Sequence, residues 1–313
     1  MRPIAACGAA VFFYSSLVLA GDRVAELIAR GQFSEALPAL EAARDAATAA
    51  GRQDREVAAV LNNLGSVYDQ LGRLRDAESM FQRSLALRRD LAESESQESA
   101  STLDNLGAVY LKLGLYAKAR ETLERAAAFE KDDLHAARVW INLAMVDQAE
   151  HRWPEAEEML RKALDVRERE LGPANRDVAV VLNDLGVLLQ SRKRPAEAEP
   201  LLERALSIWQ ATLGEKHPWV AAAFHNLGVL FMQLGRTQEA EKRISKALNI
   251  AAAVLPSNHP NLTAYMTSYA HLLRETGRKG EAKRLEASAA RSREAYRREN
   301  FLGYTVDARE IRQ

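Results

Sequence analysis

The stretch that decides the fold is Leu61-Asn62-Asn63-Leu64-Gly65-Ser66-Val67-Tyr68, because close copies of it return along the chain. The clearest copy is Leu103-Asp104-Asn105-Leu106-Gly107-Ala108-Val109-Tyr110. If Leu64 is taken as an anchor, the later anchors are Leu106, Leu143, Leu185, Leu227 and Tyr269, spaced by 42, 37, 42, 42 and 42 residues. A fixed period of this length is the signature of a repeat protein rather than of one globular core.

The copies also share residue types at fixed distances after the anchor. Thirteen residues after every anchor stands an alanine: Ala77, Ala119, Ala156, Ala198, Ala240 and Ala282. Eight residues after the anchor stands Gly72, Gly114, His151, Lys193, Gly235 or Gly277. Apolar residues three and four apart precede this turn and follow it, which predicts two helices per copy. Glycine ends the first helix at little steric cost, so we expect His151 and Lys193 to end theirs either with slight strain or with a different cap.

A single helix pair cannot bury its own apolar face, so neighbouring pairs must stack. The sequence therefore predicts an all-α fold, a right-handed α-solenoid of stacked antiparallel helix pairs. The expected division is 1–20 as a signal peptide, 21–56 as a partial N-terminal repeat, 57–290 as six repeats and 291–313 as a helical extension and tail. The Ser- and Glu-rich linker 91–101 is expected to be a loop or a frayed helix.

Composition excludes several classes of function. Lys plus Arg and Asp plus Glu both number 43 in 313 residues, so the net charge is zero and gives no basic surface for nucleic acid. The single cysteine, Cys7, cannot form an internal disulfide, and the six histidines show no metal-ligand spacing. We found no phosphate-binding loop or nucleophile motif, and so expect neither a catalytic site nor a cofactor.

The N-terminus resembles an export signal. Arg2 precedes an apolar run from Ile4 to Ala20, and Val18-Leu19-Ala20 places small residues at a cleavage site. We therefore expect an exported protein, periplasmic or secreted, with a mature N-terminus at Gly21 and no membrane insertion after cleavage. The alternative is an uncleaved anchor, because the run is close to the ~20 residues that span a bilayer.

The repeat resembles the tetratricopeptide repeat, in its Leu-Gly anchor, the tyrosine three residues after the glycine and the alanine opening the second helix. The 42-residue period and the linkers Leu213-Gly214-Glu215-Lys216-His217-Pro218 and Leu255-Pro256-Ser257-Asn258-His259-Pro260 resemble the kinesin light-chain type. The resemblance covers residues 22–290. It implies a scaffold that binds a protein or peptide in the concave groove lined by the first helices.

In the resembling family the residue just before the anchor faces this groove. Here those residues are Asn63, Asn105, Asn142, Asp184, Asn226 and Ser268, and neighbouring inward positions include His225, Met145, Val187, Val229 and Met232. Amides can hold a peptide backbone, and apolar neighbours suit apolar side chains. Two alternatives stay open. The amides can instead bond adjacent repeats together, and the chain can instead be an assembly subunit that acts through its convex face or its tail.

Overall fold

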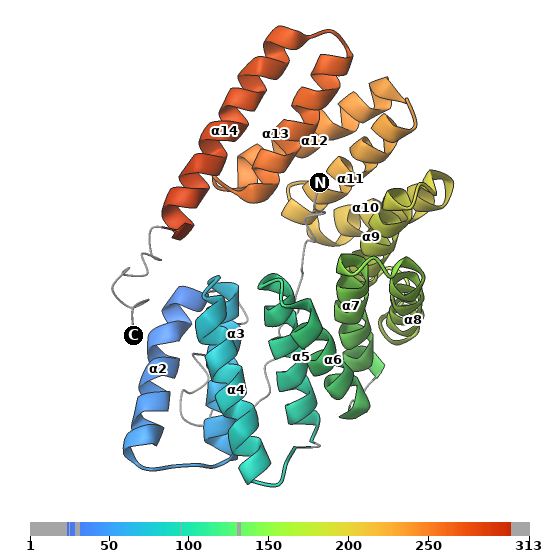
Figure 1. Cartoon of the computed structure of the whole chain (residues 1–313). Coiled ribbons are helices and arrows are strands. Elements are labelled where there is room, and N and C mark those ends of the chain that lie inside the picture. Colours follow the sequence, from blue (N-terminus) through green and yellow to red (C-terminus); the bar gives the residue numbers. More distant parts are fainter. Residues whose placement is uncertain (1–23, 25, 29–31, 95, 130–132, 302–313) are drawn as a thin grey trace. The chain divides into compact units, whose positions relative to one another are not determined.

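A computed structural model describes residues 24, 26–28, 32–94, 96–129 and 133–301, and all regular secondary structure among them is helical. The chain forms two compact units, which meet in sequence at Glu170 and Leu171. Residues up to Glu170 are called the N-terminal unit below, and residues from Leu171 the C-terminal unit. Successive helices within each unit pair and stack (Figure 1), so the predicted α-solenoid class is confirmed.

The N-terminal unit begins with the predicted partial repeat, in which Val24 and Ile28 are buried, at 2% and 3% exposure. The linker prediction was partly wrong: the loop ends at Ser96, whose side chain caps the next helix, so 97–101 are helical. Its helices are α2 (Phe33–Ala49), α3 (Arg55–Gln70), α4 (Leu74–Asp90), α5 (Gln97–Lys112), α6 (Tyr116–Phe129), α7 (Asp133–Ala149) and α8 (Trp153–Leu171).

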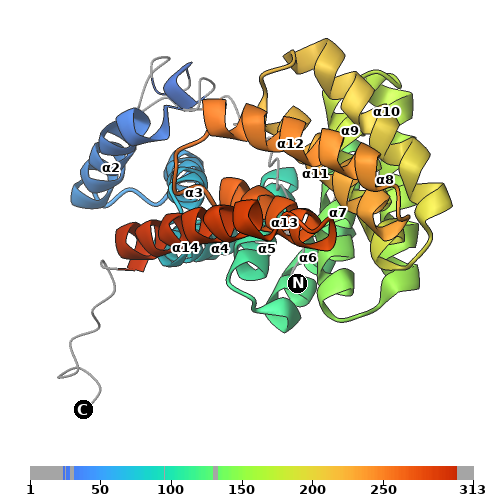
Figure 2. The same cartoon turned by 90° about the horizontal axis from the view of Figure 1, so that it is seen from above.

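The C-terminal unit continues the same alternation, and Figure 2 shows its last two helices, α13 and α14, side by side. His217 and His259 cap helices, each accepting a hydrogen bond at 3.1 Å from the backbone N–H two residues on. The last helix ends at Phe301, within the predicted extension and tail 291–313. The helices are α9 (Arg176–Ser191), α10 (Pro195–Leu213), α11 (Pro218–Gln233), α12 (Thr237–Val254), α13 (Pro260–Glu275) and α14 (Lys279–Phe301).

The turn inside each pair follows one backbone pattern. At Gly72 φ is +74°, and the next N–H, of Arg73, reaches back to the Tyr68 carbonyl at 2.8 Å. The N–H of Gly72 itself donates to the Asp69 carbonyl at 3.0 Å. Together these two hydrogen bonds satisfy carbonyls of the last helical turn. His151 and Lys193 adopt the same left-handed conformation, with φ of +62° and +59°. Both carry a Cβ that this conformation crowds, so the predicted strain at these two turns is confirmed.

Small residues set how closely the helices of a pair approach. The alanines thirteen residues after the anchors are fully buried, as at Ala77, Ala156 and Ala240. A Cβ added at Gly65 would lie 2.6 Å from Phe81 Cε1, and one at Gly107 would lie 2.6 Å from Leu123 Cγ. The first helix of each of these pairs therefore rests directly on a large side chain of the second.

The predicted signal peptide, residues 1–20, and the tail segment 302–313 lie outside the described residues. In the part of the chain that the structure does describe, no helix is both long enough and apolar enough to cross a bilayer.

Candidate functional site

The first helices of each unit, α3, α5 and α7 in one and α9, α11 and α13 in the other, carry all the predicted groove residues. We call the surface that these helices form the inner face of each unit. Its side chains are linked by one recurrent bond. The residue just before the anchor of one repeat bonds the residue two before the anchor of the preceding repeat. The pairs are Asn105 Nδ2 to Asn62 Oδ1 at 3.3 Å, Asn142 Nδ2 to Asp104 Oδ1 at 2.7 Å, Asn226 Nδ2 to Asn183 Oδ1 at 2.8 Å, and His225 Nε2 with Ser268 Oγ at 2.9 Å.

The predicted ladder therefore joins adjacent repeats, which supports the structural alternative for its asparagines. An amide offers two donor hydrogens and an acceptor oxygen, and each of the three bridges that an asparagine donates uses one of these hydrogens. Asn105 and Asn226 stay half-buried, whereas Asn63 and Asn142 are buried, at 3% and 7% exposure. Asp184 accepts from Asn183 of its own helix at 3.3 Å.

Charge holds the inner face of the N-terminal unit together. Asp104 is 1% exposed and lies at the centre of a cluster on α5 and α7. Its Oδ1 accepts from Asn142, and its Oδ2 lies 2.5 Å from Arg138 Nε. One repeat earlier, Lys112 Nζ lies 2.7 Å from Asp69 Oδ1, which joins α5 to α3.

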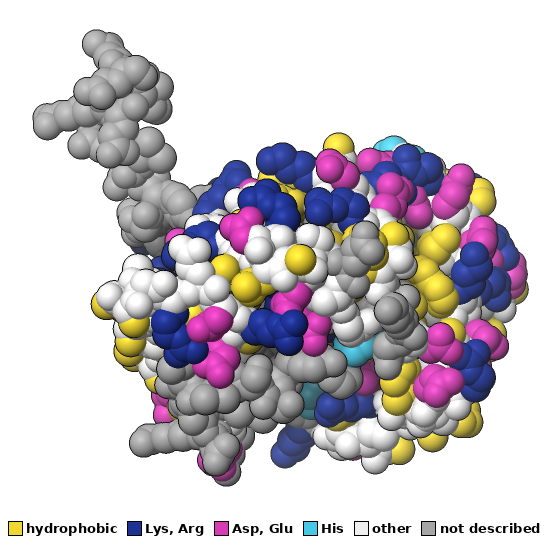
Figure 3. Space-filling model, turned by 90° about the horizontal axis from the view of Figure 1, so that it is seen from below, with side chains coloured by type: hydrophobic (Ala, Val, Ile, Leu, Met, Phe, Trp, Pro, Cys, Tyr) yellow, Lys and Arg dark blue, Asp and Glu magenta, His cyan; other side chains and the backbone are white. Residues whose placement is uncertain are grey.

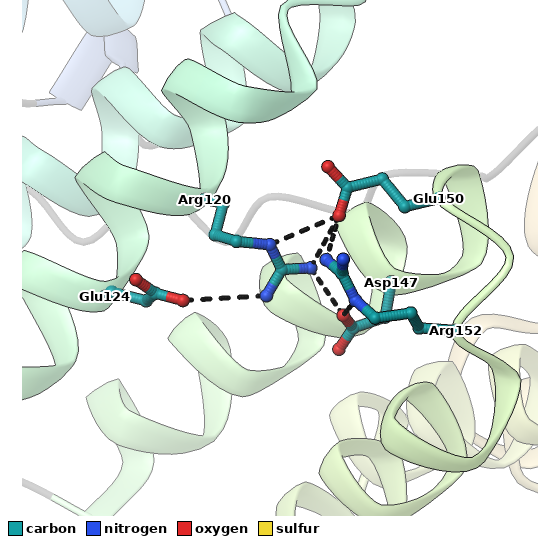
Figure 4. A network of polar contacts seen from close by, with 5 residues as sticks. All are labelled: Arg120, Glu124, Asp147, Glu150 and Arg152. Carbon is teal, nitrogen blue, oxygen red and sulfur yellow. Dashed lines mark hydrogen bonds and ion pairs between the residues drawn. The ribbon is translucent and has the colours of Figure 1, made fainter.

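A second charged network joins α6 to α7 and to the turn that follows α7 (Figure 4). The Arg120 Nη2 atom donates to Asp147 Oδ1 at 2.5 Å and to Glu150 Oε2 at 2.9 Å. Arg152 Nε donates to the same Asp147 oxygen at 2.9 Å. Burial raises the pKa of Asp147, and Arg120 opposes that effect. In this repeat Asp147 stands where the first two repeats have Tyr68 and Tyr110, so a charged cluster replaces an aromatic contact.

The inner face of the C-terminal unit is held instead by neutral groups. The His225 ring on α11 stacks on Tyr265 of α13 with centroids 4.4 Å apart, and its Nε2 meets Ser268. Desolvation lowers the pKa of His225 to about 4, so the ring is uncharged near neutral pH. Val187, Val229 and Met232 lie half-buried on α9 and α11. Met145, the remaining predicted apolar residue, is half-buried on α7 of the N-terminal unit.

An arginine that was not among the predicted residues follows the turn in most repeats. Arg73 lies 4.2 Å over the Tyr68 ring and Arg236 lies 4.1 Å over the Phe231 ring. Arg236 also pairs with Glu199 of the preceding second helix at 2.7 Å, so it joins neighbouring repeats. The recurrence of arginine at one position of the repeat could have revealed these residues. Arginine stands nine residues after the anchor at Arg73, Arg152, Arg194, Arg236 and Arg278.

The described residues give no metal-binding group, and the face drawn in Figure 3 has no broad patch of one charge. On the face drawn in Figure 3, Lys and Arg side chains are interspersed with Asp and Glu side chains rather than gathered in one region. Among the residues that the structure describes, no three His, Cys, Asp or Glu side chains group closely enough to hold a metal ion.

Comparison with known proteins matches nearly all of the repeat region to models of the tetratricopeptide repeat. The matched segments are residues 23–90, 135–208, 177–251 and 220–295 for one model and 99–129 for another. A search of curated protein sequences found no match to the chain.

Three solved structures illustrate the similarity of fold. BtubC (BKLC) from P. vanneervenii is 21% identical, with a TM-score of 0.60 over 71% of this chain and 91% of its own. A putative kinesin light chain with TPR-like repeats from Podosopora anserina is 24% identical, with a TM-score of 0.52 over 63% and 95%. A Rap protein complexed with competence and sporulation factor is 15% identical, with a TM-score of 0.68 over 90% and 77%.

These matches agree with the register of the helix pairs, the buried alanines and the left-handed turns. Proteins built from this repeat generally mediate protein–protein interactions and are generally not enzymes. The chain belongs to the tetratricopeptide repeat family.

Proposed function

We propose that this chain is a scaffold that binds an extended segment of a protein partner along its inner face, with the C-terminal unit as the main site. The observation that carries the proposal is the combination of apolar and amide side chains on α9 and α11. Val187, Val229 and Met232 are half-buried there, beside Asn226.

These side chains stand at nearby positions of the neighbouring first helices α9 and α11. Val187 and Val229 each stand two residues after an anchor, and the bond from Asn226 to Asn183 holds this register of α11 against α9. Met232 follows Val229 by three residues and so lies on the same side of α11. Burial of apolar area contributes roughly 25 cal/mol per Å², so contact with a partner's apolar side chains would favour binding.

The bridging amides complement this apolar surface. Asn226 uses one Nδ2 hydrogen for Asn183, which leaves its second Nδ2 hydrogen to meet a backbone carbonyl of a peptide. A ligand bound here would meet an amide whose position is already fixed, and fixed groups lose less entropy on binding. The same asparagine can thus hold the repeats together and hold a ligand.

The proposal can be tested with peptides selected from a phage-displayed random 12-residue library on the whole chain. We expect selected peptides to bind Val187→Lys and Val229→Lys at least tenfold more weakly than the original chain, because a lysine would desolvate against apolar groups. Ser207→Lys, exposed on the second helix α10 of the same unit, serves as the matched control and should bind normally. Circular dichroism checks that each variant is folded.

Two results would overturn the proposal. One is a selection that yields no binding peptide. The other is a set of peptides whose affinity is the same for the two valine variants and for the serine control.

We also propose that the chain is exported, as its first twenty residues indicate. Mass spectrometry of the protein from its native source should find Gly21 as the first residue. Finding Met1 on the soluble protein would contradict export with cleavage.

A further inference from the structure

The outer side of the N-terminal unit contains a cleft of about 400 Å³ between the second helices α4 and α6. Its floor is α5, with the buried side chains of Leu103, Leu106 and Tyr110. Its walls are Gln82, Leu85, Ala86 and Arg89 of α4 and Lys118, Glu121, Thr122 and Arg125 of α6, and Ser94 and Ser99 close one end. These residues lie on the side of the helix pairs away from the inner face, so the cleft is separate from the site proposed above.

The repeat register explains why this cleft is open. Residues 121 positions later occupy the same register in the C-terminal unit. There Arg243 Nη2 of α12 pairs with Glu203 of α10 at 2.7 Å, and Lys246 pairs with Glu215 at 3.0 Å. The first pair bridges the second helices α10 and α12, and the second joins α12 to the linker that follows α10. Lys246 Nζ also lies 4.5 Å from the centroid of the Phe224 ring.

In the N-terminal unit both bridges are missing from the sequence. Thr122 and Gln82 replace the Arg243–Glu203 pair, and Arg125 and Ser94 replace the Lys246–Glu215 pair. The smaller Leu103 replaces Phe224 on the floor. The cleft therefore has a cation, Arg125, at the position of Lys246, but it has no carboxylate at the positions of Glu203 and Glu215.

The rim carries a net positive charge. Arg89, Lys118 and Arg125 are exposed there, against the single carboxylate of Glu121. Arg89 lies 3.4 Å from Asp90, and Lys118 lies 5.5 Å over the Tyr110 ring. For Arg125 the described residues supply no ion-pair partner. A cation beside an apolar floor favours a ligand with a carboxylate next to an apolar side chain.

We propose that this outer cleft is a second docking site, which takes a short acidic and apolar segment of a partner protein. The partner's carboxylate pairs with Arg125, where the C-terminal unit uses its own Glu215. An adjacent Leu-sized or Phe-sized side chain packs on Leu85, Leu103 and Leu106. The cleft would let one chain hold two separate segments, so the proposal goes beyond binding at the inner face.

The decisive variant closes the cleft by copying the other unit. Gln82→Glu with Thr122→Arg installs the Glu203–Arg243 bridge at the equivalent positions. A second variant, Arg125→Glu, reverses the charge of the rim without filling the cleft. Arg293→Glu, at an exposed position of α14, makes the same charge change elsewhere and is the matched control.

The probe is a phage-displayed random 12-residue library, selected on the original whole chain and counter-selected on the closed variant. We expect peptides that carry Asp or Glu beside Leu or Phe. Their affinity, measured by fluorescence polarisation, should fall at least tenfold with Arg125→Glu, should be lost with the closed variant and should not change with Arg293→Glu. Binding should also weaken as salt is raised.

Failure of this proposal is distinguishable from failure of the first. The site is disproved if no peptide separates the two chains, if the separating peptides lack acidic residues, or if Arg125→Glu binds them normally. Peptides of the inner face respond to Val187→Lys and Val229→Lys, whereas peptides of the outer cleft should not.

Discussion

The inner faces of the two units use the same positions with different chemistry. On α5 and α7 the bridge between repeats is ionic, with Asp104 between Arg138 and Asn142. On α9 and α11 the equivalent bridge is the neutral pair of Asn226 and Asn183. A buried ionic bridge holds its two helices together, and its paired charges are not available to a ligand. A neutral bridge beside apolar side chains leaves a surface that a peptide can cover at less cost of desolvation.

The largest expected effect tests the ionic side of this comparison. Asp104→Ala should lower the free energy of unfolding by about 3–5 kcal/mol, because it leaves Arg138 and Asn142 without their acceptor in a buried place. Asn183→Ala, at the equivalent position of the neutral bridge, should cost only about 1 kcal/mol. Urea denaturation of both variants measures the difference. Equal losses would show that the ionic and the neutral bridge contribute equally to stability.

The second prediction uses pH, and it concerns the C-terminal unit. The ordinary pKa of histidine is 6.5, and the folded pKa of His225 is about 4. Between these values the unfolded chain binds a proton that the folded chain does not, so stability falls as pH falls from 6.5 to 4 and is flat above 6.5. The loss should reach at most about 3 kcal/mol.

His225→Gln should remove this part of the pH dependence while Tyr265 and Ser268 remain in place. Denaturation in urea across pH 4 to 7 measures it. An unchanged slope in the variant would show that another group titrates, and that the neutral character of this face does not depend on His225.

The third prediction compares how tightly the helix pairs of the two units are packed. A Cβ at Gly228 would lie 3.1 Å from the backbone nitrogen of Ile244 as well as against its side chain, whereas at Gly107 it meets the flexible side chain of Leu123. Gly228→Ala should therefore cost about 1–3 kcal/mol, more than Gly107→Ala. Gly280→Ala is the control, since its Cβ meets nothing within 4 Å, and it should stabilise α14 slightly. Thermal melts of the three variants rank them.

The smallest expected effect is at the two turns without glycine, one in each unit. His151→Gly and Lys193→Gly should each raise the free energy of unfolding by about 0.5–1 kcal/mol, because relief of the left-handed strain outweighs the entropy that glycine adds to the unfolded chain. The reverse change, Gly235→Lys, should destabilise by a similar amount. A loss of stability in His151→Gly alone would show that its contact with Trp153, at 5.5 Å between ring centroids, matters more than the strain.

Much of this architecture could be predicted from the spacing of residues. The anchors, the alanine thirteen residues on and the glycine eight residues on are local signals, and they give the helix pairs and their turns. The helix at 97–101 was missed because a Ser- and Glu-rich composition suggests a loop, whereas Ser96 caps a helix whose buried face includes Ala100 and Leu103. The predicted asparagines were correctly placed on the first helices, but their hydrogen-bond partners could not be named.

By itself the sequence determined the repeat, the two helices in each copy and the positions of the first-helix face, because these follow from periods within one chain segment. The tertiary structure decided which side chains meet across repeats. Asn226 and Asn183 are 43 residues apart and become neighbours only when the pairs stack. It also decided that Arg125 lines a cleft while Lys246 pairs with Glu215, since an ion pair forms only where stacking brings a carboxylate of the preceding repeat within reach.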